Sequence, residues 1–327
     1  MLVHRPATDV RSGPHPRIAC LPYDGHRLIT LDSGGILRDL KYPLHHQPRV
    51  FDTSFDYKTD TPARKRPDAD SDSQLLRWDH ELLWTKELSP GVLFAPKVTT
   101  RKREYLIYTD ATGERSCYGS DAITSSYSGR SRPASLAGAM AGLSEDQRSV
   151  YHHPHYTIGS AMIWPVKSGK VSINQARGFG RTGQMIGDRM DLTLECIRRH
   201  YTELTGEGPG GEFRDAYWEF LAVIDSCKDF FELFGHQEEG FRAFVDFFHL
   251  QDLTTPDYKQ VRHFLPFDNF QSSGLPASTA DYVTYRNATL EFISGRGRRM
   301  AEWVSRNHPD IEVRCPWWRP SRKGLSS

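Results

Sequence analysis

The chain of 327 residues is long enough to bury a sizeable core, and 12% of its residues are aromatic side chains, which bury more area each than aliphatic ones. The charges of its 42 basic and 41 acidic side chains nearly cancel, so the chain lacks the overall positive charge that would attract a polyanion such as a nucleic acid. The five cysteines are scattered singly without a C-x-x-C pair, which argues against a disulfide framework and a structural zinc site. We expect a reducing, cytoplasmic location.

Neither an N-terminal leader nor a membrane span is expected. The first 20 residues contain proline and arginine but no apolar stretch typical of a signal peptide. No window approaches the ~18 consecutive apolar residues that a spanning helix needs. We therefore expect no membrane as a partner.

The first half of the chain predicts short strands and hairpins. Residues 26–40 predict a hairpin around Asp32-Ser33-Gly34-Gly35, and residues 74–87 predict a helix with Asp72 or Ser73 as its N-cap. Further strands are expected at residues 104–109 and 117–125, and a second hairpin at residues 158–164 and 170–174.

From residue 184 onwards helical periodicity dominates. One buried helical face is predicted by apolar residues spaced three or four apart: Ile186, Met190, Leu194, Ile197, Tyr201 and Leu204. Similar spacing predicts helices around residues 217–227 and 241–248, and a last helix from residue 280 to about residue 305. Seven phenylalanines are expected in the core rather than in a ligand site: Phe230, Phe231, Phe234, Phe241, Phe244, Phe247 and Phe248.

These elements predict the α+β class, with an antiparallel sheet in a strand-rich and hairpin-rich N-terminal half that packs against a mainly helical C-terminal half. We expect a single composite domain over residues 1–327. Residues 1–50 would be an N-terminal extension with a hairpin, and residues 310–327 a basic tail that contains tryptophan.

Eight stretches of the chain together resemble an uncharacterised family of single-domain bacterial proteins, a domain of unknown function. The stretches are residues 51–56, 59–62, 82–86, 172–178, 191–201, 230–235, 245–253 and 264–268. The likeness extends from about Phe51 to Phe292 and implies no activity, cofactor or site residue. The glycines after Arg177 and the tryptophan-rich tail look particular to this sequence.

A glycine-rich segment after Arg177 is the first candidate site. Gly178, Gly180 and Gly183 form a G-x-G-x-x-G pattern before a predicted helix, and Arg181 lies within it. With Asn174, these residues could bind a phosphate of NAD or another nucleotide. The match to a dinucleotide-binding fold is poor, because the preceding strand is expected in an antiparallel hairpin. A loop that simply caps the helix is the alternative that the pattern favours.

The helix that follows carries charged side chains near this loop. Asp191 and Glu195 lie four residues apart on one face, as do Glu195 and Arg199. The carboxylates could act as general bases, while Arg177 could hold a phosphate. A solvated helix face with i, i+4 ion pairs explains the same pattern without a function.

Two other groups of residues have weaker signals. His152, His153 and His155 lie close together, but no fourth ligand stands at a recognised zinc spacing, so we expect a surface loop and no metal site. Trp317 and Trp318 lie among arginines near the C-terminus, a combination that suits single-stranded nucleic acid but also a basic tail docked by its tryptophans.

Two functional hypotheses remain open at this stage. The first is an enzyme that acts on a nucleotide or nucleic acid, such as an ADP-ribosyl transferase of the toxin or defence type. Arg177, Asp191 and Glu195 would be its catalytic residues and His200 a further candidate. The second is a non-catalytic protein-binding or regulatory module, in which Arg177 and Glu195 form structural ion pairs instead of lining a cleft.

Overall fold

The structure is a computed structural model of the whole chain, which divides into two compact units, residues 1–49 and 50–327. The described residues are 29–31, 37–39, 50–60, 69, 73–89, 92–96, 104–110, 113–120, 123, 134–145, 147, 156–165, 172–177, 186–202 and 214–316. In the first unit, β1 (Ile29–Leu31) and β2 (Leu37–Asp39) pair antiparallel, which confirms the first predicted hairpin. That the chain forms one composite domain stays a prediction.

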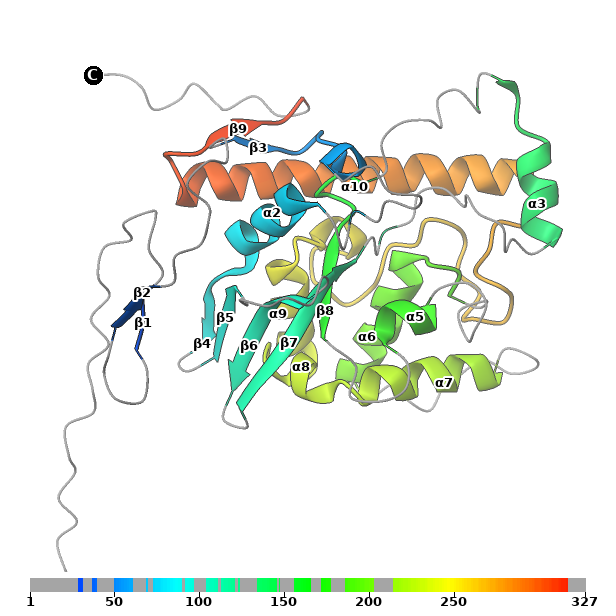
Figure 1. The fold of residues 1–327 in the computed structure, drawn as a ribbon. Helices are drawn as coiled ribbons and strands as arrows, with labels where there is room; N and C mark the ends of the chain where they lie inside the picture. The colour runs from blue at the N-terminus through cyan, green and yellow to red at the C-terminus, as the bar shows by residue number, and fades with distance from the viewer. Residues whose placement is uncertain are drawn as a thin grey trace, which may run out of the picture. The chain divides into compact units, whose positions relative to one another are not determined.

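The second unit contains an antiparallel five-stranded sheet in the order β4-β5-β6-β7-β8 (Figure 1). Its strands are β4 (Glu87–Ser89), β5 (Val92–Pro96), β6 (Glu104–Asp110), β7 (Gly113–Ser120) and β8 (Met162–Pro165). All five strands are in chain order, and each neighbouring pair is antiparallel. The expected α+β class is therefore confirmed.

Helices dominate the rest of the second unit. They are α2 (Gln74–Trp84), α3 (Ala134–Ala141), α5 (Ile173–Arg177), α6 (Met190–Thr202), α7 (Arg214–Asp225), α8 (Lys228–Glu232), α9 (Gln237–Phe247) and α10 (Thr279–Asn307), with the short 3-10 helices η2 (Tyr57–Asp60) and η5 (Gln251–Leu253). Ser73 caps α2, since its Oγ accepts the N–H of Leu76 at 3.0 Å. The helix ends before the predicted residue 87, because Glu87 enters β4.

The second predicted hairpin is wrong. Strand β8 pairs with β7, and Ile173 and Asn174, which are expected in its partner strand, lie in helix α5 instead. Ser172 and Gln175 form a reciprocal capping pair, in which Gln175 N–H donates to Ser172 Oγ at 3.2 Å and Ser172 N–H donates to Gln175 Oε1 at 3.4 Å. This S-x-x-Q pattern is a helix-start signal that outweighs the β-branched residues around it.

Two distant parts of the second unit meet beside the longest helix. Strand β3 (Val50–Asp52) pairs in parallel with β9 (Glu312–Arg314), and both strands contact α10 (Figure 1). Helix α10 begins with a capping box between Ser278 and Asp281 and runs through 29 residues. Among the described residues, no helix combines the length and the apolar character needed to cross a membrane.

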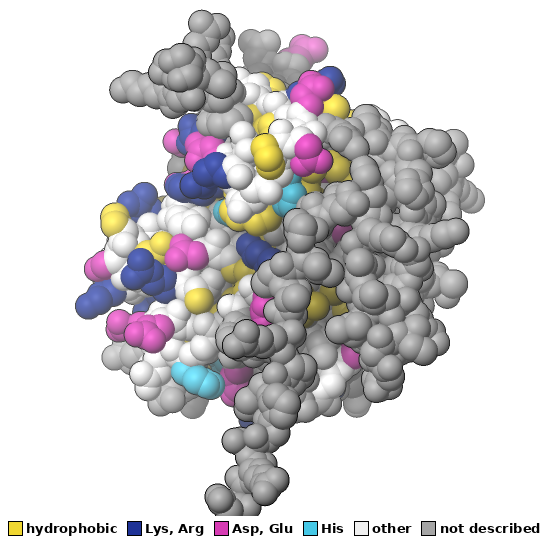
Figure 2. All heavy atoms as spheres, turned by 90° about the vertical axis from the view of Figure 1, so that its left-hand side faces the viewer, with side chains coloured by type: hydrophobic (Ala, Val, Ile, Leu, Met, Phe, Trp, Pro, Cys, Tyr) yellow, Lys and Arg dark blue, Asp and Glu magenta, His cyan; other side chains and the backbone are white. Residues whose placement is uncertain are grey.

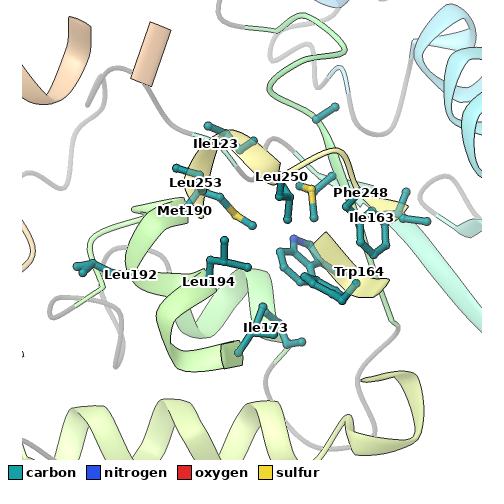
Figure 3. Close-up of a cluster of buried hydrophobic side chains, with 14 of the residues drawn as sticks. Ile123, Ile163, Trp164, Ile173, Met190, Leu192, Leu194, Phe248, Leu250 and Leu253 are labelled. Atoms are coloured by element: carbon teal, nitrogen blue, oxygen red, sulfur yellow. The ribbon is translucent and has the colours of Figure 1, made fainter. Parts of the chain in front are cut away.

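The core joins the sheet to the C-terminal helices. All seven predicted core phenylalanines are buried, and Phe94 of β5 contacts the rings of Phe230, Phe234 and Phe247. A second part of the core surrounds Trp164 of β8, which lies among Leu194 of α6, Leu250 and Ile173 of α5 (Figure 3). The predicted apolar face of α6 is buried, although Ile186 lies before the helix and Leu204 lies outside the described residues.

Candidate acid–base site at the start of helix α6

The chain reaches α6 through a tight turn in the left-handed region. Gly187 and Asp188 both have φ of 57°, a conformation that is easy for glycine and costs an aspartate of order 1 kcal/mol. The N–H of Asp188 donates to the carbonyl of Arg177 at 2.9 Å, which ties the start of α6 to the end of α5. Non-glycine residues in this region cluster at functional sites and ligand clamps.

Arg177, the predicted phosphate clamp, is fully buried in this turn. Its Nη2 donates to the backbone carbonyl of Asp188 at 2.8 Å, and its Nη1 lies 3.4 Å from Asp188 Oδ1. The guanidinium therefore holds the turn before α6 in place. Arg177 could therefore affect the binding of a substrate only indirectly, by fixing the shape of this turn.

Asp191, in the first turn of α6, is buried and held as an anion. Arg189 forms a two-pronged ion pair with its carboxylate, with Nε 3.1 Å from Oδ1 and Nη2 against Oδ2. The N–H of Phe264 donates to Oδ2 at 2.9 Å. Burial alone raises the pKa of Asp191, but Arg189, His263 and the Phe264 N–H outweigh it and lower the pKa to about 2. Asp191 is ionised at neutral pH.

His263 completes this arrangement. Its Nδ1 lies 3.6 Å from Asp191 Oδ2, and its side chain is 14% exposed. The imidazole stacks on Phe267 with ring centroids 4.1 Å apart and planes tilted by 18°, which fixes the ring's orientation. The contact is longer than a hydrogen bond, and Nδ1 is buried without a hydrogen-bond partner in the described part of the chain. A small approach of the two groups would give the carboxylate–imidazole pair by which enzymes orient a histidine base.

Glu195, one turn further along α6, is buried between two arginines. Its Oε1 accepts from Arg199 Nε and Arg198 Nη2, both at 2.8 Å, and its Oε2 accepts from Arg198 Nε at 2.9 Å. Burial alone raises its pKa, but these bonds lower it below the usual value. The predicted i, i+4 pair with Arg199 is confirmed, but the expected solvated helix face is buried.

Arg199 links α6 to α7 and to the irregular residues 254–278. It donates from Nη1 to the Tyr217 hydroxyl at 3.0 Å and from Nη2 to Asn269 Oδ1 at 2.5 Å. Asn269 and Phe270 are consecutive residues in the left-handed region, with φ of 59° and 60°. Two such residues in a row indicate a loop that the surrounding structure holds firmly.

The other predicted binding residues do not add to this site. Asn174 lies half-buried in α5. Gly178, Gly180, Arg181 and Gly183 lie outside the described residues, and so do His152, His153 and His155. In the described part of the chain, no group of three or more histidines, cysteines or acidic residues is placed to hold a metal ion.

His263 is the member that the sequence did not place in the site, and the pairing of Arg189 with Asp191 was not predicted either. Arg189 stands two residues before Asp191, but ordinary helix spacing does not reveal such a pair. His263 is 72 positions from Asp191. Its only signal in the sequence is the stretch 264–268 that follows it, which is rich in phenylalanine and proline. The contact appears when residues 254–278 pack over α6.

Comparison with curated proteins and with solved structures gives no match. A family model described as a family of unknown function, DUF6994, matches residues 51–300. The match includes α6, the irregular residues 254–278 and most of α10. Because the match covers well over half of the sequence, the chain belongs to the family of unknown function DUF6994.

Proposed function

We propose that the protein is an enzyme that performs acid–base chemistry at the start of α6 on a substrate that carries a phosphate, as a nucleotide does. The observation that supports this best is the chain of contacts from Arg189 through Asp191 to His263. It places a buried, ionised carboxylate 3.6 Å from one nitrogen of a partly exposed imidazole.

In this proposal His263 is the general base. When the 3.6 Å contact closes to a hydrogen bond, Asp191 keeps the proton on Nδ1, which leaves Nε2, on the far side of the ring, to take a proton from the substrate or from water. The negative charge of Asp191 also stabilises the imidazolium that forms. Because Arg189 and the Phe264 N–H satisfy both oxygens of Asp191, the carboxylate stays in place during the proton transfer.

The phosphate part of the proposal comes from one exposed cation next to His263 in the chain and from the sequence pattern that follows Arg177. Arg262 precedes it and is exposed, and the segment with Gly178, Arg181 and Gly183 follows Arg177 directly in the sequence. On the face shown in Figure 2, basic and acidic side chains are interspersed. The near balance of 42 basic and 41 acidic side chains in the chain suits a single nucleotide better than the long backbone of a nucleic acid, which attracts a continuous basic stripe.

The narrower hypothesis, an ADP-ribosyl transferase that uses NAD, has less support from the geometry. That chemistry needs a glutamate that faces a sugar cation, whereas Glu195 accepts three hydrogen bonds from Arg198 and Arg199. Glu195 would first have to leave both arginines. His263 with Asp191 is therefore the better candidate for the reacting group.

The test combines binding with turnover. Purified protein is screened by thermal shift against NAD, ATP, GTP and nucleoside monophosphates, and each mixture is analysed for products by mass spectrometry. A ligand at ~100 times its Kd stabilises by about 2.7 kcal/mol, which is a readable shift. We expect one nucleotide to shift the melting temperature and to be converted.

Two substitutions assign the roles. We expect His263→Gln to lower kcat by about 100-fold or more while the nucleotide still binds, because general-base catalysis contributes about that much. Arg181→Ala should weaken nucleotide binding. His308→Gln, which changes a half-buried histidine at the end of α10, is the matched control and should keep full turnover. Full turnover by His263→Gln would remove the proposal.

A non-catalytic binding module remains the second candidate. It is favoured because Glu195 and Arg177 each form an ion pair within the protein. Both side chains are buried and engaged with neighbours on their own or adjacent elements, as a structural role requires. This candidate predicts a folded protein without turnover of any nucleotide in the panel and with a stable protein partner in pull-downs.

A further inference from the structure

A cavity of about 670 Å³ lies at the opposite end of α6 from Asp191, between the end of α6, α7, α8 and the first residues of α9. Pockets that bind small organic molecules have volumes of about 300–1,000 Å³. His200, a weaker candidate from the sequence, lines this cavity. His200 is nine positions after Asp191, which is about 14 Å along a helix.

One wall of the cavity is aromatic and apolar. Tyr201 and Phe231 are buried, Leu221 adds aliphatic surface, and Trp218 is half-buried. The Tyr201 hydroxyl donates to the Phe231 carbonyl at 2.6 Å, so its hydrogen-bonding capacity is used inside the wall. The His200 ring packs against Phe231 with centroids 5.5 Å apart and planes inclined by 55°. This wall suits a flat or apolar group.

The charged lining is mainly acidic. Asp225 and Glu232 contribute carboxylates, and Lys228 contributes an ammonium. Within the described residues neither carboxylate forms an ion pair. Burial lowers the pKa of His200, while Asp225 and Glu232 act to raise it, so the negative potential of both carboxylates reaches this wall. His200 is neutral at neutral pH, and the fixed charges leave an excess of negative charge.

We propose that this cavity binds a small organic cation, an amine whose aromatic or aliphatic body lies against Trp218 and Phe231 and whose ammonium faces Asp225 and Glu232. The ring faces attract a cation as well as an apolar body. An anion is disfavoured, because Glu238 and Glu239 add negative charge at the start of α9. A metal ion is disfavoured too, since no ligand cluster of the required size is found in the described part of the chain.

Isothermal titration with matched probes tests the proposal. Tryptamine carries the ammonium, tryptophol is its neutral analogue, and indole-3-acetate is an anionic one. We expect tryptamine to bind at least about tenfold more tightly than tryptophol, the value of one hydrogen bond to a charged group. Indole-3-acetate should bind most weakly. Agmatine, an aliphatic cation, should bind the same site and compete with tryptamine.

Three variants locate the binding. The double variant Asp225→Asn with Glu232→Gln should lose the tenfold preference for tryptamine. Ala222→Trp, at an exposed position that lines the cavity, should fill the cavity and abolish binding of every probe. Glu219→Gln changes an exposed carboxylate of α7 that does not line the cavity and should leave the affinity within about twofold, as expected for a surface substitution outside the site.

The proposal is overturned if tryptamine and agmatine give no binding heat, if tryptophol or indole-3-acetate binds as tightly as tryptamine, or if Ala222→Trp still binds the probes. It is independent of the proposed enzyme, because His263→Gln should bind tryptamine like the wild type. Failure of the nucleotide screen therefore leaves this test unaffected.

Discussion

The residue just before α6 and one in the middle of α10 are each a buried arginine, and the two positive charges are satisfied in different ways. Arg189 is paired with the carboxylate of Asp191. Arg296 is fully buried and donates instead to backbone carbonyls: Gly159 at 2.8 Å, Ala161 at 2.7 Å and Phe248 at 2.9 Å. Its Nη2 reaches the weak acceptor Sδ of Met162 at 3.2 Å.

The difference between the two arginines indicates two roles. A carboxylate partner leaves a fixed negative charge beside His263, which chemistry can use. Carbonyl partners instead connect segments of the chain, and Arg296 joins α10 to residues 158–161 and to the end of α9. These segments approach closely, since a Cβ on Gly159 would collide with the Ile293 carbonyl. Burial without an anion lowers the pKa of Arg296 to about 9.

The largest effect is expected for Arg296→Met. It would leave three buried carbonyls without donors, each at a cost of about 1–3 kcal/mol, although it also removes a costly buried charge. We expect the free energy of unfolding to fall by about 4 kcal/mol in urea denaturation. Arg298→Met, at an exposed neighbour on α10, should change it by less than about 0.5 kcal/mol. Equal effects of both variants would show that Arg296 does not hold these segments together.

The next effect is expected for Asp191→Asn, which leaves Arg189 buried without its anion. Breaking a buried pair in this way costs about 3 kcal/mol, and urea denaturation at pH 7 measures it. The pKa of Asp191 is lowered from 3.8 to about 2 in the folded state. The ionised carboxylate therefore contributes stability above pH 4, and this contribution is lost as the pH falls from about 4 to about 2.

The pH dependence separates this explanation from a simple loss of packing. The pKa difference corresponds to about 2 kcal/mol, so the gap between the wild type and Asp191→Asn should narrow by that amount over the same window. Asp310→Asn, at an exposed position, should follow the wild type at every pH. A gap that stays constant down to pH 3 would contradict the ionised state of Asp191.

The sequence predicts what local spacing determines. Ser73 as an N-cap, the helical phase of α6 and the pair of Glu195 with Arg199 all depend on residues within four positions of one another. The start of α5 carries a local signal of the same kind, because Ser172 and Gln175 form a capping pair. The prediction of a strand at this position is nevertheless wrong.

Contacts between distant positions could not be predicted. His263 reaches Asp191 across 72 positions, and Arg296 reaches Ala161 across 135. Because the charged residues of α6 follow a regular helical spacing, the sequence predicts that this polar face is exposed to solvent. In the structure residues 254–278 cover it and supply the Phe264 N–H and the Asn269 oxygen. An irregular segment has no periodicity from which its position could be inferred.

The smallest effect is expected for Glu195→Gln. Arg199 would keep its bonds to Tyr217 and Asn269, and the Arg198 side chain is 16% exposed, so water can replace part of what is lost. We expect the free energy of unfolding to fall by about 1.5 kcal/mol, near the lower limit for hydrogen bonds to a charged group. Urea denaturation against Glu291→Gln, an exposed glutamate of α10, isolates this loss.

Turnover then decides what Glu195 does. If Glu195 only holds Arg198 and Arg199 in place, the folded Glu195→Gln variant should convert the nucleotide at nearly the wild-type rate, because His263 and Asp191 are unchanged. If Glu195 reacts with the substrate, the rate should fall by about 100-fold or more with little change in stability. The second result would make Glu195, one turn further along α6, the reacting group. The contact between Asp191 and His263 would then serve only to hold His263 in place.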